Sequence, residues 1–188
     1  MARLTFYYGT MNTGKSLLLL AFAAKLRNKG IPYLVLKSSR DTRDGSFISS
    51  RPLQEKLSCI MWEPDTPFPP EWIDNTHNYK YILVDEAQFL TKDQVEALAN
   101  VVDTCNINVI CYGLRTDFKT NLFEGSKRLF EIADELHEIE DFDARGNKII
   151  FNARINAEGK VVKNGPQIVI GAEDKYQSMS RYEYYWGY

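Results

Sequence analysis

Short apolar runs recur through the first two thirds of the chain and stand between polar or helix-forming segments. They cover residues 4–8, 33–37, 81–84 and 109–113, with a weaker run at 57–62. Continuous apolar runs of this length are typical of strands that are buried on both faces of a parallel sheet. We therefore expect a sheet of parallel strands at the centre of the fold.

Three segments of the chain have the composition of helices and carry signals at their ends. The signals are Gly30 after the first, a capping box from Thr91 to Gln94 at the start of the second, and Ser126 before the third. The expected helices cover residues 17–26, 94–102 and 127–133. Strands that alternate with helices predict a three-layer α/β domain.

The character of the sequence changes near residue 140, where short strands and tight turns replace the helices. Asn164-Gly165 and residues 157–160 have the composition of hairpin turns. We therefore predict two domains, an α/β domain over residues 1–139 and a small β-rich domain over residues 140–188. The strands expected in the second domain are 149–155, 161–162 and 167–170.

Two stretches of the first domain show no periodic pattern. Residues 40–52 are polar and are expected to form a mobile loop, and the proline-rich residues 64–78 are expected to form a surface loop. The polar loop has the composition of a segment that closes over a ligand, and such closure would exclude water.

Residues 9–16 read Gly-Thr-Met-Asn-Thr-Gly-Lys-Ser and directly follow the first apolar run. Glycine lets backbone N–H groups fold around phosphate oxygens, Lys15 adds a mobile positive charge, and Ser16 offers a hydroxyl to Mg²⁺. The helix expected after Ser16 places its positive dipole end at the same point. A site for a nucleoside triphosphate is therefore predicted, with contacts from Gly9, Thr10, Met11, Asn12, Thr13, Gly14, Lys15 and Ser16.

Two adjacent carboxylates, Asp85 and Glu86, end the apolar run 81–84. Asp85 is expected to hold Mg²⁺ with Ser16 through water, which leaves Glu86 to act as a base. Successive strand residues face opposite ways, so the two acids need not share one task. A base can take a proton from water or from a hydroxyl, and at this point both hydrolysis and phosphoryl transfer stay open.

Composition narrows the class of protein. The chain has 188 residues, 44% of them hydrophobic, which suffices for one ordinary core with a small appendage. A net charge of −2 and a pI near 5.8 disfavour a broad nucleic-acid-binding surface. The three cysteines form no C-x-x-C pair, and neither an apolar leader nor a membrane-length run is present. We expect a soluble, cytoplasmic protein with no membrane or nucleic-acid partner.

Six motifs, taken in order, resemble those of the type II thymidine kinases, the cytosolic and viral family. They are Gly9–Ser16, Asp41-Thr42-Arg43, Ser50-Arg51, Asp85–Phe89, Gly113–Phe118 and Gly171–Tyr176. The resemblance implies a P-loop, RecA-like parallel sheet flanked by helices, plus a small β-rich lasso domain. It also implies Mg²⁺-dependent transfer of the γ-phosphoryl group of ATP to the 5′-hydroxyl of thymidine by a homotetramer, with deoxyuridine as a possible second acceptor.

The resemblance also assigns roles to single residues. Glu86 becomes the general base, Lys15 contacts the phosphates, and Arg43 stabilises charge on the transferring group. Asp41, Asp85 and Gln88 join the phosphate loop in nucleotide binding. The nucleoside contacts carried over are Met11, Phe89, Leu114, Phe118, Phe123, Asn152, Ile168, Val169, Ile170, Gly171 and Tyr176.

The chain departs from the family pattern in its small domain. Most members bind structural zinc there through four cysteines, but the matching positions fall near Phe142 or Asp143 and at Arg145, Ser180 and Glu183. We therefore predict a zinc-free enzyme whose small domain is stabilised by aromatic packing. The aromatic residues are Phe142, Phe151, Tyr182, Tyr184, Tyr185 and Trp186.

A second departure is Asn152, because many relatives carry threonine near the base, and it leaves the pyrimidine preference open. Two other functions compete with the kinase. A nucleic-acid-dependent ATPase also carries an Asp-Glu-Ala-Gln motif like that of residues 85–88, but its motor normally uses two RecA-like domains. A non-catalytic nucleotide-binding module would not need Glu86.

Overall fold

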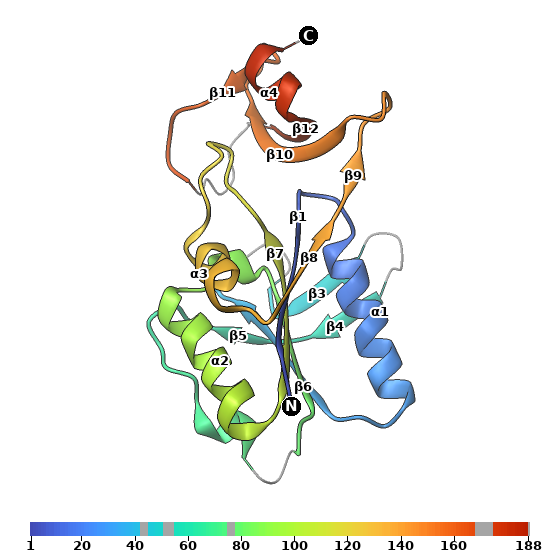
Figure 1. The fold of residues 1–188 in the computed structure, drawn as a ribbon, viewed down its shortest axis with the longest axis vertical. Helices are drawn as coiled ribbons and strands as arrows, with labels where there is room; N and C mark the ends of the chain where they lie inside the picture. Colours follow the sequence, from blue (N-terminus) through green and yellow to red (C-terminus); the bar gives the residue numbers. More distant parts are fainter. Residues whose placement is uncertain (42–44, 51–54, 75–77, 168–174, 188) are drawn as a thin grey trace.

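A single parallel sheet forms the centre of the molecule (Figure 1). The computed structural model describes residues 1–41, 45–50, 55–74, 78–167 and 175–187. Within them the central sheet has six strands in the order β5-β2-β6-β7-β1-β8, and every neighbouring pair is parallel. The strands are β1 (Leu4–Gly9), β2 (Tyr33–Ser38), β5 (Ile60–Trp62), β6 (Tyr81–Asp85), β7 (Asn108–Leu114) and β8 (Glu135–Ile139).

Helices cover both faces of this sheet, which confirms the predicted three-layer arrangement (Figure 1). Helix α1 (Lys15–Asn28) packs on one face through a buried leucine-rich side. Helices α2 (Lys92–Cys105) and α3 (Glu124–Ile132) pack on the other face, where Val95 and Leu98 are fully buried. These apolar residues recur at helical spacing, so α2 buries one side and exposes the other.

The predicted helix ends are right in two cases and wrong in one. Thr91 and Gln94 form a complete capping box, and Gly30 follows α1 with a φ of 64°. Ser126 does not cap the third helix, because α3 begins at Glu124. The Ser126 hydroxyl donates instead to the carbonyl of Leu114 at 2.6 Å, which ties α3 to the end of β7.

Three expectations, two for irregular segments and one for the weak strand, hold only in part. The polar stretch 40–52 contains a strand, β3 (Phe47–Ser50), which pairs with β4 (Glu55–Ser58) and buries Ile48. The weak run 57–62 is divided between β4 and β5. The proline-rich loop contains the short helix η1 (Pro70–Ile73), and its aromatic side chains pack edge-on against buried Trp62.

A small antiparallel sheet lies beyond the carboxyl ends of the central strands (Figure 1). It contains β9 (Asp141–Phe142), β10 (Lys148–Ile155), β11 (Val161–Val162) and β12 (Lys175–Ser180), followed by helix α4 (Arg181–Trp186). Strand β10 pairs with the other three. Gln167 lies outside any strand, and the rest of the strand expected at 167–170 falls outside the described residues.

The aromatic side chains of the small domain pack only in part as predicted. Phe151 and Tyr184 are buried with their rings 5.0 Å apart, and the Tyr185 ring lies 5.0 Å from Tyr184. Phe142 and Tyr182 are 53% and 70% exposed, and Trp186 is 79% exposed, so these three do not contribute to the core as expected. In the described part of the chain no helix is both long and apolar enough to span a bilayer.

Candidate active site

The phosphate loop connects β1 to α1 and depends on glycine at both ends. A β-carbon on Gly9 would lie 2.8 Å from the Thr13 hydroxyl oxygen and 2.9 Å from the carbonyl oxygen of Ile139. Gly14 has a φ of +84°, which other residues rarely adopt. Any side chain at Gly9 would therefore displace the loop, and any at Gly14 would strain it.

Polar groups inside the loop fix its shape. The Thr13 hydroxyl donates to the Thr10 carbonyl at 3.0 Å, and the Lys15 ammonium donates to the same carbonyl. Lys15 is also the first residue of α1, whose first turn carries no acidic residue. A lysine and a helix N-terminus at one point form a site that favours phosphate.

A hydroxyl and a carboxylate meet beside the loop. The Ser16 hydroxyl donates to Asp85 Oδ2 at 3.2 Å, although the two residues belong to different elements. Burial, together with the neighbouring Glu86, raises the pKa of Asp85 to about 7. A cation here would favour the ionised carboxylate, and hydroxyl and carboxylate oxygens are donors that magnesium prefers, so this pair fits a magnesium site.

Glu86 follows Asp85 with a strained backbone and a fixed side chain. Its φ of 50° lies in the left-handed region, which is uncommon for glutamate and frequent at functional sites. The Gln88 amide donates to Glu86 Oε2, and its oxygen accepts the Leu114 N–H at 3.0 Å. Gly113 leaves room for this bridge, since a β-carbon there would lie 2.9 Å from the Gln88 oxygen. Both ends of the Gln88 amide therefore serve to orient Glu86 within the protein.

Sequence reasoning missed a buried ion pair next to these acids. Lys37 Nζ lies 2.9 Å from Asp41 Oδ2, and both side chains are almost fully buried. Lys37 is paired with Asp85 in the β2–β6 register, and its charge acts to lower the pKa of Asp85. The available signal was a lysine at the end of an apolar strand. Arg43 lies outside the described residues.

The predicted nucleoside contacts come together in small groups. The rings of Phe89 and Phe123 meet edge-on at 5.6 Å. Phe118 is buried below the Arg154 guanidinium, whose centre lies 4.2 Å from the Phe118 ring and 5.9 Å from the Tyr176 ring. The expected contacts Ile168, Val169, Ile170 and Gly171 lie outside the described residues.

Met11 and Asn152 also meet, through the backbone of Met11. The Met11 N–H donates to Asn152 Oδ1 at 2.7 Å, and the Ser178 hydroxyl donates to the Met11 carbonyl at 3.1 Å. The small sheet thus contacts the phosphate loop directly. Ser178 carried no recognisable signal in the sequence.

Residues of the small sheet region and of α4 also hold the loop between β7 and α3. The Tyr184 hydroxyl donates to the Phe118 carbonyl at 2.7 Å, and Gln167 Nε2 donates to Asp117 at 3.0 Å. The Lys119 ammonium donates to the Gly165 carbonyl at 2.9 Å. Together with the Met11 contacts, these bonds attach the small domain to both sides of the candidate site.

The positions that match zinc-binding cysteines do not fit a zinc site. The Ser180 N–H donates to the Glu183 carboxylate at 2.7 Å, and the Glu183 N–H donates back to the Ser180 hydroxyl at 3.3 Å, so the pair forms a capping box for α4. Asp143 accepts hydrogen bonds from the N–H groups of Arg145 and Asn147. Among the described residues, no three histidine, cysteine or acidic side chains gather as a metal site.

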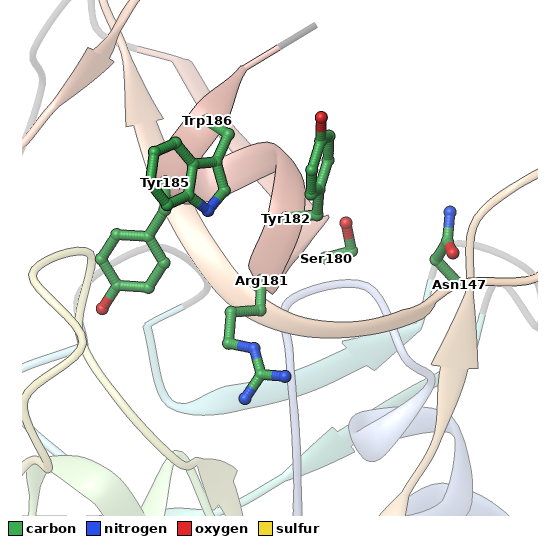
Figure 2. Close-up of a pocket in the computed structure, with 6 residues that line it drawn as sticks. All are labelled: Asn147, Ser180, Arg181, Tyr182, Tyr185 and Trp186. Carbon is green, nitrogen blue, oxygen red and sulfur yellow. The ribbon is translucent and has the colours of Figure 1, made fainter.

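A hollow of about 550 Å³ lies elsewhere, against α4 (Figure 2). Its lining residues are Asn147, Ser180, Arg181, Tyr182, Tyr185 and Trp186. None of them belongs to the phosphate loop, to the Asp85–Glu86 pair or to the predicted nucleoside contacts. This hollow is therefore separate from the candidate active site.

Comparison with known proteins identifies relatives over nearly the whole chain. The family profile described as "Thymidine kinase" matches residues 2–184. Thymidine kinase of Xanthomonas oryzae pv. oryzae (strain MAFF 311018) is 41% identical over 187 residues, which are 98% of this chain and 90% of that protein. Thymidine kinase of Enterobacteria phage T4 is 42% identical over 183 residues, 96% of this chain and 94% of that protein.

Solved structures with a similar fold include a DNA-replication protein. A replication initiator DnaA bound to AMPPCP and single-stranded DNA matches 77% of this chain and 42% of its own, with a TM-score of 0.45 and 22% identity. This similarity is too low to bear on function.

Proposed function

The chain belongs to the thymidine kinase family, and we propose that it transfers the γ-phosphoryl group of ATP to the 5′-hydroxyl of thymidine. The observation that carries the proposal is Glu86, held by Gln88 next to the Ser16–Asp85 pair. A general base beside the metal-binding groups of a phosphate loop is the arrangement that transfer to an alcohol requires.

The phosphate loop binds the donor. Backbone N–H groups of residues 9–16 and the Lys15 ammonium contact the ATP phosphates. Ser16 and Asp85 would hold a magnesium ion, and this ion would neutralise negative charge on the triphosphate. Arg43 adds positive charge near the transferring group. Asp41, which is paired with Lys37, is the other nucleotide contact proposed near it in sequence.

Glu86 acts on the acceptor. Its carboxylate takes the proton of the 5′-hydroxyl as that oxygen forms a bond to the γ-phosphorus. The bond from the γ-phosphorus to the β,γ-bridging oxygen breaks, and ADP leaves with the electron pair. The products are thymidine 5′-monophosphate and ADP. Because Gln88 already fixes the carboxylate, little reorientation precedes the reaction.

The nucleoside lies between the two proposed domains, which are residues 1–139 and residues 140–188. Phe89, Phe118, Phe123 and Leu114 provide apolar surface for the base and sugar. Tyr176 approaches from the small sheet. Residues 168–171 are expected to recognise the edge of the pyrimidine base. The same contacts would also admit deoxyuridine.

Other properties of the family are proposed for this chain as well. We expect a zinc-free, cytoplasmic homotetramer with no nucleic-acid partner. The capping box of Ser180 and Glu183 supports the absence of zinc, because it uses both side chains of the second matching pair. Elemental analysis of purified, tag-free protein checks this point, and one zinc ion per chain would contradict it.

Product analysis tests the activity itself. Purified protein is incubated with ATP and Mg²⁺, and with either thymidine or single-stranded DNA. Formation of thymidine 5′-monophosphate in equal amount with ADP is expected in the first mixture only. ATP hydrolysis stimulated by DNA, without a phosphorylated nucleoside, would instead support the nucleic-acid-dependent ATPase.

A further inference from the structure

In the described parts of the chain, side chains of the small sheet form hydrogen bonds to the phosphate loop at Met11. Its N–H donates to Asn152 Oδ1 at 2.7 Å, and its carbonyl accepts the Ser178 hydroxyl at 3.1 Å. Both backbone polar groups of Met11 are therefore bonded to side chains of the small sheet. We call these two contacts the Met11 clasp.

The clasp is built from paired positions. Asn152 and Ser178 are direct partners in the antiparallel register of β10 and β12, and Ser178 Oγ lies 3.5 Å from Asn152 Oδ1. Asn152 is only 4% exposed. Its oxygen must face Met11, because a backbone N–H cannot donate to the amide nitrogen. The contact is thus a specific hydrogen bond that a buried side chain accepts.

The clasp matters because Met11 belongs to the loop predicted to bind the ATP phosphates. Met11 lies between Gly9 and Gly14 in the loop that cradles the ATP phosphates. Two residues along β10 from Asn152, the Arg154 guanidinium packs on the Phe118 ring and approaches Tyr176. One strand therefore contacts the phosphate loop and the predicted nucleoside pocket. A shift of β10 relative to Met11 would change the alignment of the two substrates.

We propose that Asn152 and Ser178 are positioning residues for phosphoryl transfer, which fix the phosphate loop to the small sheet and so align the 5′-hydroxyl with the γ-phosphate. This proposal rests on the proposed function. Neither residue touches the reacting atoms; both act through Met11. Asn152 accordingly has a role different from the direct contact with the base that its sequence position implies.

Five variants test the clasp by steady-state kinetics. Ser178→Ala and Asn152→Ala each remove one bond to Met11, and we expect kcat to fall about 5-fold to 20-fold, with KM for thymidine changed by less than about 2-fold. Ser178→Thr and Asn152→Asp keep the hydroxyl and the acceptor oxygen, so kcat is expected to return to within about 3-fold of the original. The double alanine variant should lose less than the product of the single losses, because both bonds hold one residue.

Hydrogen exchange gives a readout that does not depend on turnover. In ligand-free protein, the Met11 amide should exchange about 10-fold faster or more in Asn152→Ala, because its acceptor is lost. Gln177→Ala, an exposed neighbour on β12, serves as the matched control and should change neither exchange at Met11 nor kcat.

Several outcomes would overturn the proposal. One is unchanged kcat in both alanine variants. Another is a higher KM for thymidine at unchanged kcat in Asn152→Ala alone, which would make Asn152 a direct nucleoside contact. A third is a loss of activity that parallels the fall in melting temperature of each variant and that Ser178→Thr does not restore. If Asn152→Ala fails to fold, the two Ser178 variants and Asn152→Asp decide. Failure of the unaltered protein to phosphorylate thymidine would refute the proposed function instead.

Discussion

The carboxyl edge of the central sheet and the small sheet hold their site residues in different ways. At the central sheet, short-range bonds such as those from Gln88 to Glu86 and from Lys15 to Thr10 accompany the bond between Ser16 and Asp85, which are 69 residues apart. At the small sheet, the bonds join distant parts of the chain. Ser178 and Met11 are 167 residues apart, and Tyr184 and Phe118 are 66 residues apart.

This difference separates two tasks. In the proposed mechanism, the groups that move protons or bind phosphate are shaped largely by local backbone geometry, such as the positive φ values of Gly14 and Glu86. In the proposed mechanism, the groups that align the two substrates depend on how the small sheet packs against the phosphate loop and the loop between β7 and α3. Variants at the central sheet should therefore affect chemistry most, and variants at the small sheet should affect alignment and nucleoside binding.

Glu86→Gln should have the largest effect. The amide keeps the shape of the side chain but cannot accept the proton, so kcat should fall by roughly 10²–10⁴-fold. Affinity for ATP should change little, because the phosphate loop is intact. Steady-state kinetics and calorimetric titration with a non-hydrolysable ATP analogue measure both quantities. Glu158→Gln, in an exposed turn, is the control, and unchanged kcat in Glu86→Gln would remove the residue from the base role.

Gln88→Met tests whether the base must be oriented. Methionine has a similar volume but cannot bond to Glu86 or to the Leu114 N–H, so kcat should fall by about 10-fold to 100-fold. The melting temperature identifies any loss due to unfolding. Gln177→Ala, which is exposed, again provides the control. If kcat is retained, the Gln88 bridge is irrelevant to catalysis.

The raised pKa of Asp85 predicts that the free energy of unfolding depends on pH. Its pKa is raised to about 7 in the folded protein, above the ordinary value of 3.8, so the folded state binds the proton more tightly than the unfolded state. This contribution to stability is present below about pH 4 and is lost as pH rises toward 7. From pH 5 to pH 8 it should lower the free energy of unfolding by on the order of 2 kcal/mol.

Urea unfolding in EDTA measures this contribution. Asp85→Asn should remove that part of the pH dependence, whereas Asp103→Asn, on the exposed side of α2, should leave it intact. Equal pH dependence in the Asp85→Asn variant and the unaltered protein would show that Asp85 does not titrate in this range.

Tyr184→Phe should have the smallest effect. It removes only the hydroxyl that donates to the Phe118 carbonyl, and one such bond contributes about 0.5–1.5 kcal/mol. KM for thymidine should rise by roughly 2-fold to 10-fold, while KM for ATP stays constant. Tyr182→Phe, on the same helix but 70% exposed, should leave both unchanged. Equal changes in the two KM values would contradict a role confined to the nucleoside side.

Much of the central sheet could be predicted from the sequence, because its signals are local. The strands that carry Gly9 and Asp85 are continuous apolar runs, and the capping box at Thr91 occupies four residues. Strand β8 was missed, because an edge strand of mixed polarity such as Glu135–Ile139 lacks such a run. Strand β3 was missed for a similar reason, since only Ile48 in it is a buried apolar residue.

The contacts of the small domain could not be predicted in the same way. The Met11 clasp depends on the register of β10 and β12 and on how their sheet packs against the phosphate loop. The sequence spacing of Met11, Asn152 and Ser178 predicts neither the register of the two strands nor the packing of their sheet against the loop. The exposure of Trp186 likewise depends on the orientation of α4, and composition alone suggested a buried aromatic cluster.

The most direct test of the account is a crystal structure with thymidine and a non-hydrolysable ATP analogue. We predict that the 5′-oxygen lies within hydrogen-bond distance of the Glu86 carboxylate, about 2.6–3.2 Å, and faces the γ-phosphorus. A Glu86 side chain directed away from the sugar, with no space for deoxyribose beside the terminal phosphate, would contradict the account.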